Sequence, residues 1–213
     1  MAKVEISGKV YEYDYGTSFE QIARDVQADY DSTIILCVAN GKIRELHRNV
    51  EGDCKLSMIT LKDSAGHKTY ERSATMIFVK ALCDVIGDPI KGKAKVEFAI
   101  GKGIYISAKG DYKVDSELAS AVEERMRDIV AKDIPIVKKN YPIDEAVRIF
   151  DKLGMTDKVK LFKYRQSSTV NVYSIEDYSD YYYGYMAPST GYIKYFEVFP
   201  YQDGFILLIK KKN

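Results

Sequence analysis

The chain has 213 residues, 46% of them hydrophobic, and a formal net charge of +1. This length and composition suit a globular protein with one large domain or two small ones, and we expect two. The near-zero net charge argues against a broad basic surface for nucleic acid, although a local basic patch is compatible with it.

Two further properties indicate where the protein works. No apolar run approaches the roughly 18 residues of a membrane span, and the stretch 1–5 lacks the apolar centre of a signal peptide. Cys37, Cys54 and Cys83 are odd in number and have no C-x-x-C spacing, which favours small buried side chains over a disulfide framework or a zinc site. We therefore expect a cytoplasmic protein that contacts no membrane.

The first 62 residues show a hairpin, a helix and three strands. Apolar residues flank a Gly8-Lys9 turn, and the one-sided spacing from Phe19 to Val26 predicts a helix capped by Thr17 or Ser18. Three strands are expected after it, at 33–39, 42–46 and 55–61, with Asn40-Gly41 as the hairpin turn between the first two. This order predicts a ubiquitin-like β-grasp domain over residues 1–62.

Residues 63–213 mix helices and strands. An apolar helix is expected from Ser73 to Ile86, and further helices should begin at Asp115 or Ser116 and at Pro142. Strands are expected at 95–107 (interrupted by a Gly101-Lys102-Gly103 turn), 158–163, 171–173, 192–199 and 204–209. We expect an α+β fold overall, with residues 63–213 as the second domain.

The segment Asp180–Gly191 resembles the D-x-C-x-G-P-H-x-x-S-T-G segment of the editing domain attached to threonyl-tRNA synthetases. In that family the Cys and His act with an H-x-x-x-H helix as a hydrolytic or metal-binding centre. Here Tyr182 stands at the Cys position and Met186 at the His position, while Arg72 and Met76 replace the two helical histidines.

The resemblance extends along the chain. The segments 100–105, 124–126 and 132–136 follow in the order of the editing domain, and the 52–56 ending looks like a TGS domain. The segments Tyr70–Ser73 and Asp180–Gly191, the latter followed by Tyr192 and Phe196, resemble the bacterial uridine kinase-like proteins more than a synthetase. In that family a TGS domain and an editing-like domain precede a phosphoribulokinase/uridine kinase module. That resemblance implies a C-terminal kinase module as partner, with ATP and magnesium as cofactors of that module alone.

The kinase module itself is not in this sequence. Phosphoryl transfer needs a glycine-rich phosphate loop with a Lys and a Ser or Thr. The stretch from Gly87 to Ala94 mimics the spacing, but it ends in Ala94, follows a helix and contains Pro89, which removes one amide.

Editing chemistry is also expected to be lost. Arg72 stays cationic near neutral pH, and Met76 and Met186 are thioethers with little affinity for zinc. Tyr182 is a weak acid, since a tyrosine hydroxyl ordinarily has a pKa of about 10. His47 and His67 have no second ligand at helical or hairpin spacing, so we expect no metal, no cofactor and no catalytic residue in this chain.

The replaced pocket could still bind a ligand. If the family geometry holds, a guanidinium, tyrosine rings and hydroxyls converge there, as suits a nucleotide, a phosphate or a tRNA terminus. Our candidate ligand-binding set is Arg72, Met76, Tyr182, Tyr183, Met186, Ser189 and Thr190, with Tyr185 nearby. Alternatively, the tyrosines lie on an exposed sheet face.

A basic stretch, Lys158, Lys160, Lys163 and Arg165, could guide RNA phosphates or guard a strand edge. The resulting hypothesis is a non-catalytic regulatory or ligand- and RNA-binding N-terminal region of a uridine kinase-like protein. A free-standing tRNA-editing hydrolase related to threonyl-tRNA synthetase and a protein-interaction module are the alternatives.

Overall fold

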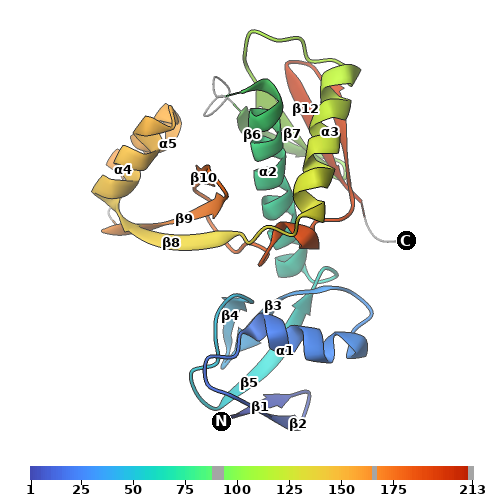
Figure 1. Ribbon diagram of the computed structural model, residues 1–213, viewed down its shortest axis with the longest axis vertical. Helices are drawn as coiled ribbons and strands as arrows, with labels where there is room; N and C mark the ends of the chain where they lie inside the picture. The colour runs from blue at the N-terminus through green and yellow to red at the C-terminus, as the bar shows by residue number, and fades with distance from the viewer. Residues whose placement is uncertain (88–93, 165–166, 211–213) are drawn as a thin grey trace.

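The computed structural model describes residues 1–87, 94–164 and 167–210. Over these residues the chain is a mixed α+β protein with three sheets (Figure 1). The blue N-terminal sheet lies at one end, and the long helix α2 rises from it into the remainder. The expected α+β class is confirmed. Among the described helices, none is both long and apolar enough to cross a membrane.

The first sheet has five strands in the order β2-β1-β5-β3-β4. Strands β1 and β5 are parallel, and the other neighbours are antiparallel. Helix α1 packs on one face, where its buried side chains meet those of the strands. The bounds are β1 (Ala2–Ile6), β2 (Lys9–Tyr13), α1 (Phe19–Val26), a 3₁₀ turn η1 (Gln27–Asp29), β3 (Ile34–Ala39), β4 (Lys42–Glu45) and β5 (Cys54–Thr60).

The local signals in this region acted as expected. The Ser18 hydroxyl accepts a hydrogen bond from the Gln21 amide at 3.1 Å and so caps α1. Asn40 and Gly41 both have positive φ, 48° and 78°, as a tight two-residue hairpin turn requires. The expected helix and strands are confirmed to within one or two residues.

Helix α2 (Ser64–Ile86) is the central element of the molecule. It begins at Ser64, well before the expected Ser73, because its first turns carry polar residues that hide the apolar pattern. Thr69 and Ser73 are nevertheless buried, and their hydroxyls donate to the carbonyls of Ala65 and Thr69 at 2.9 and 2.8 Å.

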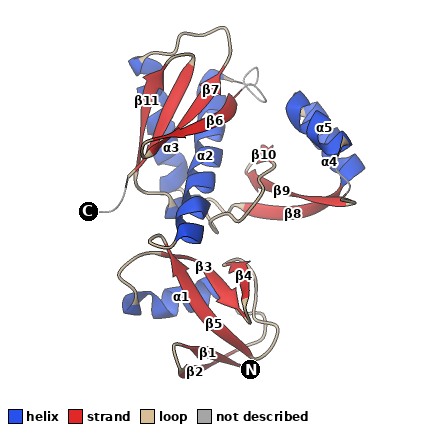
Figure 2. Cartoon of the chain, turned by 180° about the vertical axis from the view of Figure 1, so that it is seen from behind, coloured by secondary structure: helices blue, strands red, loops and turns tan. Residues whose placement is uncertain are grey.

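A four-stranded antiparallel sheet in the order β11-β12-β7-β6 packs on α2 and α3. Figure 2 shows both helices behind this sheet, with its other face turned toward the viewer. The bounds are β6 (Ala94–Ile100), β7 (Gly103–Ala108), α3 (Ser116–Ala131), β11 (Phe196–Tyr201) and β12 (Gly204–Ile209). Asp115 caps α3 by accepting from the Leu118 amide at 3.0 Å, as expected.

The third sheet has the order β10-β9-β8 and carries two helices at its end. Its elements are β8 (Val137–Pro142), α4 (Ile143–Lys152), α5 (Thr156–Lys163), β9 (Thr169–Ile175) and β10 (Tyr178–Asp180). Strand β8 was missed because it begins two residues after Pro135, which was read as the end of the preceding segment, and is largely exposed.

Two sequence-based assignments are wrong. The 158–163 stretch is the helix α5 rather than a strand, because Phe162 is buried against Phe150 with ring centroids 5.5 Å apart. Its short Lys-apolar alternation fits both the strand and the helix period. Between 192 and 195 there is no strand either, since 190–192 form a 3₁₀ turn (η3) and β11 begins at Phe196.

Two hydrophobic cores meet at β3. Ile34 and Cys37 belong to the core under α1, whereas Ile35 and Leu36 belong to the larger core around α2. Because one strand serves both cores, the division at residue 62 stays a prediction. Cys37 and Cys83 are buried, Cys54 is partly exposed, and the three form no disulfide.

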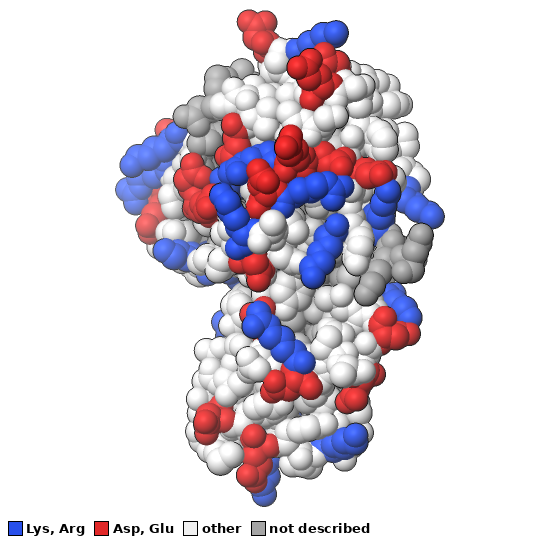
Figure 3. All heavy atoms as spheres, turned by 45° about the vertical axis from the view of Figure 1, so that its right-hand side comes forward, with Lys and Arg blue, Asp and Glu red and all other residues white. Residues whose placement is uncertain are grey.

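Charge is distributed without a dominant sign. Figure 3 shows acidic and basic side chains interspersed over the face that it displays. This agrees with the net charge of +1 and gives no broad basic surface on that face.

Gly66 is required where α2 leaves β5. A Cβ at this position would lie 2.0 Å from the Thr60 carbonyl oxygen. Gly66→Ala should therefore destabilise the protein by about 2 kcal/mol, although alanine is favoured over glycine by about 1 kcal/mol in an open helix. Urea unfolding measures the change. The matched control is Ser120→Ala on the exposed face of α3, where little change is expected, and a stabilised Gly66→Ala variant would contradict the close approach.

Candidate functional site

A groove of about 450 Å³ lies between α2, β6, α5 and the tyrosine segment 181–183. We call it the tyrosine groove. It is lined by Lys68, Glu71, Arg72, Thr75, Val96, Ile104, Lys158, Leu161, Tyr181, Tyr182 and Tyr183. Helix α2 contributes the residues of one face because positions three and four apart lie on the same side of a helix. The groove therefore combines three cations, one acid, three tyrosines and apolar side chains.

Arg72 is fixed in the groove wall by the backbone of the tyrosine segment. Its Nη1 donates to the Tyr185 carbonyl at 2.7 Å, while the guanidinium as a whole carries five N–H donors. Gly184 permits this contact: it has a φ of 129°, and a Cβ there would meet Arg72 Cζ at 2.5 Å. Burial lowers the pKa of Arg72, opposed by the nearby Tyr173 and Glu71, but arginine stays charged at neutral pH.

Tyr182 and Tyr183 present different groups to the groove. The Tyr183 side chain is 85% exposed, so its ring is available for stacking. Tyr182 is half-buried, and burial followed by the Asp180 charge raises the pKa of its hydroxyl well above the usual value. Tyr182 is therefore a neutral phenol at physiological pH and cannot act as a base.

Asp180 lies buried behind the groove wall. Its carboxylate accepts from the Tyr181 amide at 2.6 Å and the Tyr178 hydroxyl at 3.0 Å, and it lies 3.4 Å from Lys158 Nζ. Burial raises the pKa of Asp180, and the Lys158 charge opposes the shift.

The other expected site residues lie outside the tyrosine groove. Met76 and Met186 are buried in the larger core. Ser189 donates its hydroxyl hydrogen bond to Asp133, and Thr190 accepts from the Ile134 amide and donates to the Ile129 carbonyl, both at 2.8 Å. Of the seven expected residues, Arg72, Tyr182 and Tyr183 share the groove. Ser189 and Thr190 are not among the residues that line it.

A buried polar cluster beside the groove was not found from the sequence. Glu45 of β4 accepts from the Tyr173 hydroxyl at 2.6 Å, Lys138 Nζ at 2.7 Å and the Met186 amide at 3.0 Å. No local pattern marks Glu45, because it is one of three charged residues in the four-residue strand β4. A carboxylate with partners 93 to 141 residues away is visible only in the fold.

The two histidines lie on different parts of the chain, and each has an acid near it in sequence. His47 Nε2 lies 3.9 Å from Glu45 and His67 Nε2 lies 3.2 Å from Glu71. Burial lowers the pKa of His47, as do Lys138 and Arg48, against the opposing charge of Glu45. Within the described ranges, no three His, Cys, Asp or Glu side chains gather as metal ligands. The expectation that no metal binds stays a prediction.

The basic stretch is on a helix rather than a strand edge. Lys158, Lys160 and Lys163 belong to α5, and Arg165 lies outside the described residues. Lys158 alone of these lines the groove. The Gly87–Ala94 stretch also lies mostly outside the described residues, since 88–93 are not described.

Comparison with known proteins relates the chain to threonine–tRNA ligases. No family model matches it. The ligase of Acetivibrio thermocellus is 25% identical over 200 residues, which is 93% of this chain and 31% of the ligase. Those of Thermotoga petrophila and Rhodospirillum rubrum are 28% and 29% identical, over 90% and 86% of this chain and 29% and 28% of their own lengths.

The chain thus spans about 30% of the length of these relatives. Over this span it is similar in sequence to threonine–tRNA ligases. The expected link to uridine kinases has no support from these comparisons.

The buried carboxyl of Asp180 should make stability depend on pH. Its pKa is raised in the folded protein, so the folded state holds the proton more tightly than the unfolded state. The resulting stabilisation is complete below the ordinary aspartate pKa of 3.8 and is lost as pH rises through the raised value.

Urea unfolding of the wild type and Asp180→Asn between pH 3 and 7 measures how much Asp180 contributes to the free energy of unfolding at each pH. Relative to the variant, the wild type should lose stability as pH rises. A flat difference would show that Lys158 and the hydrogen bonds cancel the effect of burial on the pKa, and a difference that moves the other way would show that they outweigh it.

Proposed function

We propose that the tyrosine groove binds the aminoacylated end of tRNA, or a small molecule resembling it, without hydrolysing it. The observation that carries this proposal is the position of Arg72, held by the Tyr185 carbonyl in a groove shared with Tyr182, Tyr183 and Lys158. A guanidinium and a lysine suit phosphate, and the exposed Tyr183 ring suits a base.

Similarity to threonine–tRNA ligases supports a tRNA-related ligand over a kinase-linked one. We accordingly propose that residues 63–213 form an editing-like domain. For residues 1–62 we propose a TGS-type β-grasp, supported by the strand order β2-β1-β5-β3-β4 and the single packed helix. Neither a metal nor a cofactor is part of the proposal.

The side chains at the replaced positions favour binding over catalysis. Releasing an amino acid from tRNA needs a base that positions water, or a metal that lowers the pKa of water. Arg72 is a cation, Tyr182 is a neutral phenol, and Met76 and Met186 are buried in the core. None of the four activates water.

The binding test uses an RNA hairpin that mimics the tRNA acceptor stem, titrated into the protein by calorimetry or NMR. One stacked base contributes about 1–3 kcal/mol and a charge-assisted hydrogen bond about 1.5–3 kcal/mol, so after association costs we expect a micromolar-to-millimolar constant. Arg72→Ala and Tyr183→Ala should each weaken binding about fivefold or more.

Matched controls are Arg148→Ala and Tyr15→Ala, two exposed residues outside the tyrosine groove. They should bind as the wild type does. If the groove variants bind equally well, or if nothing binds below several millimolar, the groove is a packed remnant and the interaction-module alternative replaces this proposal.

A hydrolase is the second candidate, and one observation favours it. Asp180 is a buried carboxylate with a raised pKa, 3.4 Å from Lys158 at the groove wall, and a carboxylate with such a shift can serve as a general base. We expect no release of amino acid from mischarged tRNA above a no-enzyme control. Turnover that Asp180→Asn abolishes would establish the hydrolase and overturn our reading.

A further inference from the structure

Two attachments to helix α2 bracket the segment that carries the tyrosines of the groove. At one end, Lys80 Nζ donates to a carboxylate oxygen of Asp177 at 3.1 Å. At the other end, Arg72 Nη1 donates to the Tyr185 carbonyl at 2.7 Å. We call the residues between these attachments, 178–184, the groove arch. It comprises strand β10 and the three tyrosines that line the tyrosine groove.

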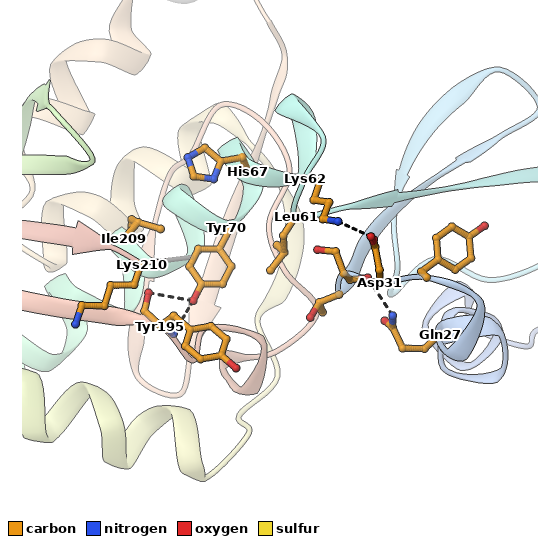
Figure 4. A pocket seen from close by; sticks show the side chains of 12 residues that line it. Gln27, Asp31, Leu61, Lys62, His67, Tyr70, Tyr195, Ile209 and Lys210 are labelled. Atoms are coloured by element: carbon orange, nitrogen blue, oxygen red, sulfur yellow. Dashed lines mark hydrogen bonds and ion pairs between the residues drawn. The ribbon is translucent and has the colours of Figure 1, made fainter. Parts of the chain in front are cut away.

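Further attachments follow along α2. The Ala187 amide donates to the Ser73 hydroxyl at 2.8 Å. Figure 4 shows the next one, in which the Tyr195 amide donates to the Tyr70 hydroxyl at 2.8 Å. The chain after β9 therefore runs beside α2 from the second half of the helix back toward its start, and the β9–β10 hairpin lies next to α2 in both Figure 1 and Figure 2.

The groove arch is longer than the stretch of helix that it follows. Lys80 and Arg72 are eight residues apart, which is about 12 Å along the helix axis. The eight residues from Asp177 to Tyr185 can extend over about 27 Å. The segment therefore has slack, and an attachment at each end reduces the number of conformations open to it.

Lys80 is a buried cation surrounded by carboxylates. Its side chain is 2% exposed, and Nζ lies 3.2 Å from Asp84 on the same helix. The same atom lies 3.4 Å from Glu176 and 3.1 Å from Asp177, the two residues of the β9–β10 turn. Burial lowers the pKa of Lys80, but Asp177 and Asp84 more than offset this effect, so the pKa is raised and the amine stays charged. A buried charge needs such partners, which ties the turn to α2.

The backbone of the turn supports the same view. Glu176 has a φ of 52°, in the left-handed region where a turn of this kind favours glycine. Its carboxylate contact with Lys80 gives a reason for a glutamate there. Asp84 has a second partner, since Arg125 Nε donates to it at 2.9 Å. The contacts between Lys80 and the turn are therefore the part of this network that bears on the groove arch.

We propose that Lys80 is a positioning residue for the tyrosine groove, because it fastens the β9–β10 turn to α2 and so holds the groove arch in the shape that the ligand needs. This inference rests on the function proposed above, in which the groove binds the end of tRNA. Lys80 does not line the groove and acts only through the arch. An arch that is already ordered loses less entropy when the ligand binds.

The test releases the turn in two ways. Lys80→Met keeps an unbranched chain in the buried position, and replacing a buried ion pair by an apolar side chain is often tolerated. The double variant Glu176→Gln/Asp177→Asn retains Lys80 and changes only turn side chains, which are 45% and 78% exposed. Urea unfolding confirms that each variant is folded.

Both variants should loosen the groove arch and weaken RNA binding. NMR order parameters of the 181–183 amides should fall, and the acceptor-stem RNA hairpin should bind about threefold more weakly or worse. Lys80→Met combined with the double variant should bind no more weakly than the weaker of the two, because both release the same attachment.

Two controls remove contacts elsewhere. Tyr70→Phe removes the attachment to Tyr195, on α2 but outside the groove arch. Lys113→Met removes an exposed ion pair with Asp115. Both controls should keep the wild-type order parameters at 181–183 and the wild-type RNA affinity.

The proposal is overturned if the 181–183 amides stay as ordered in both variants as in the wild type. It is also overturned if they become mobile while RNA affinity is unchanged; the wild type then still binds, and the function proposed above stands. If the wild type itself binds no RNA below several millimolar, that function fails, and Lys80 has no ligand for which to position the arch.

Discussion

The buried carboxylate of Glu45 is the interaction on which the arrangement of this molecule depends. It is 3% exposed, lies at the end of β4 in the first sheet and accepts hydrogen bonds from Tyr173, Lys138 and the Met186 amide. An ionised carboxylate is expensive to bury unless it is paired and hydrogen-bonded. The first sheet therefore cannot move away from β8, β9 and the 184–187 segment without leaving donors and a charge unsatisfied.

The same cluster determines the shape of the tyrosine groove. Around Met186, the Tyr185 carbonyl accepts from Arg72 and the Ala187 amide donates to the Ser73 hydroxyl at 2.8 Å. The Tyr173 hydroxyl also lies 2.9 Å from the Gly184 carbonyl. Side chains from three elements thus hold consecutive peptide groups, and the segment just before them, 181–183, is displayed beside α2. Rigid support of this kind is what a binding site needs to select a ligand.

Local features of the sequence predicted most of the fold and part of the site. Cap and turn residues such as Ser18, Asp115 and Asn40-Gly41 located their elements because their effect is confined to a few neighbouring residues. The stretch 158–163 was assigned to a strand because its mixture of lysine and apolar residues fits the period of a strand as well as that of a helix. Burial of Phe162 favours the helix. Arg72, Tyr182 and Tyr183 share a groove as expected, whereas Ser189 and Thr190 satisfy backbone and carboxylate groups elsewhere. Glu45 was missed because its partners are distant in sequence.

Native-state hydrogen exchange of Glu45→Ala tests this role of Glu45 most directly. In the wild type, the Met186 amide should exchange only on an opening that separates the first sheet from the remainder. In the variant, its protection should fall by about 3 kcal/mol, the typical cost of breaking a buried charged network. Amides in the centre of each core, that of Cys37 in the core under α1 and that of Ile129 in the larger core, should keep more of their protection. Glu5→Ala, which removes a partly exposed carboxylate paired with Lys55, should change little. If Met186 is as protected in Glu45→Ala as in the wild type, the carboxylate does not hold the junction together and the account is wrong.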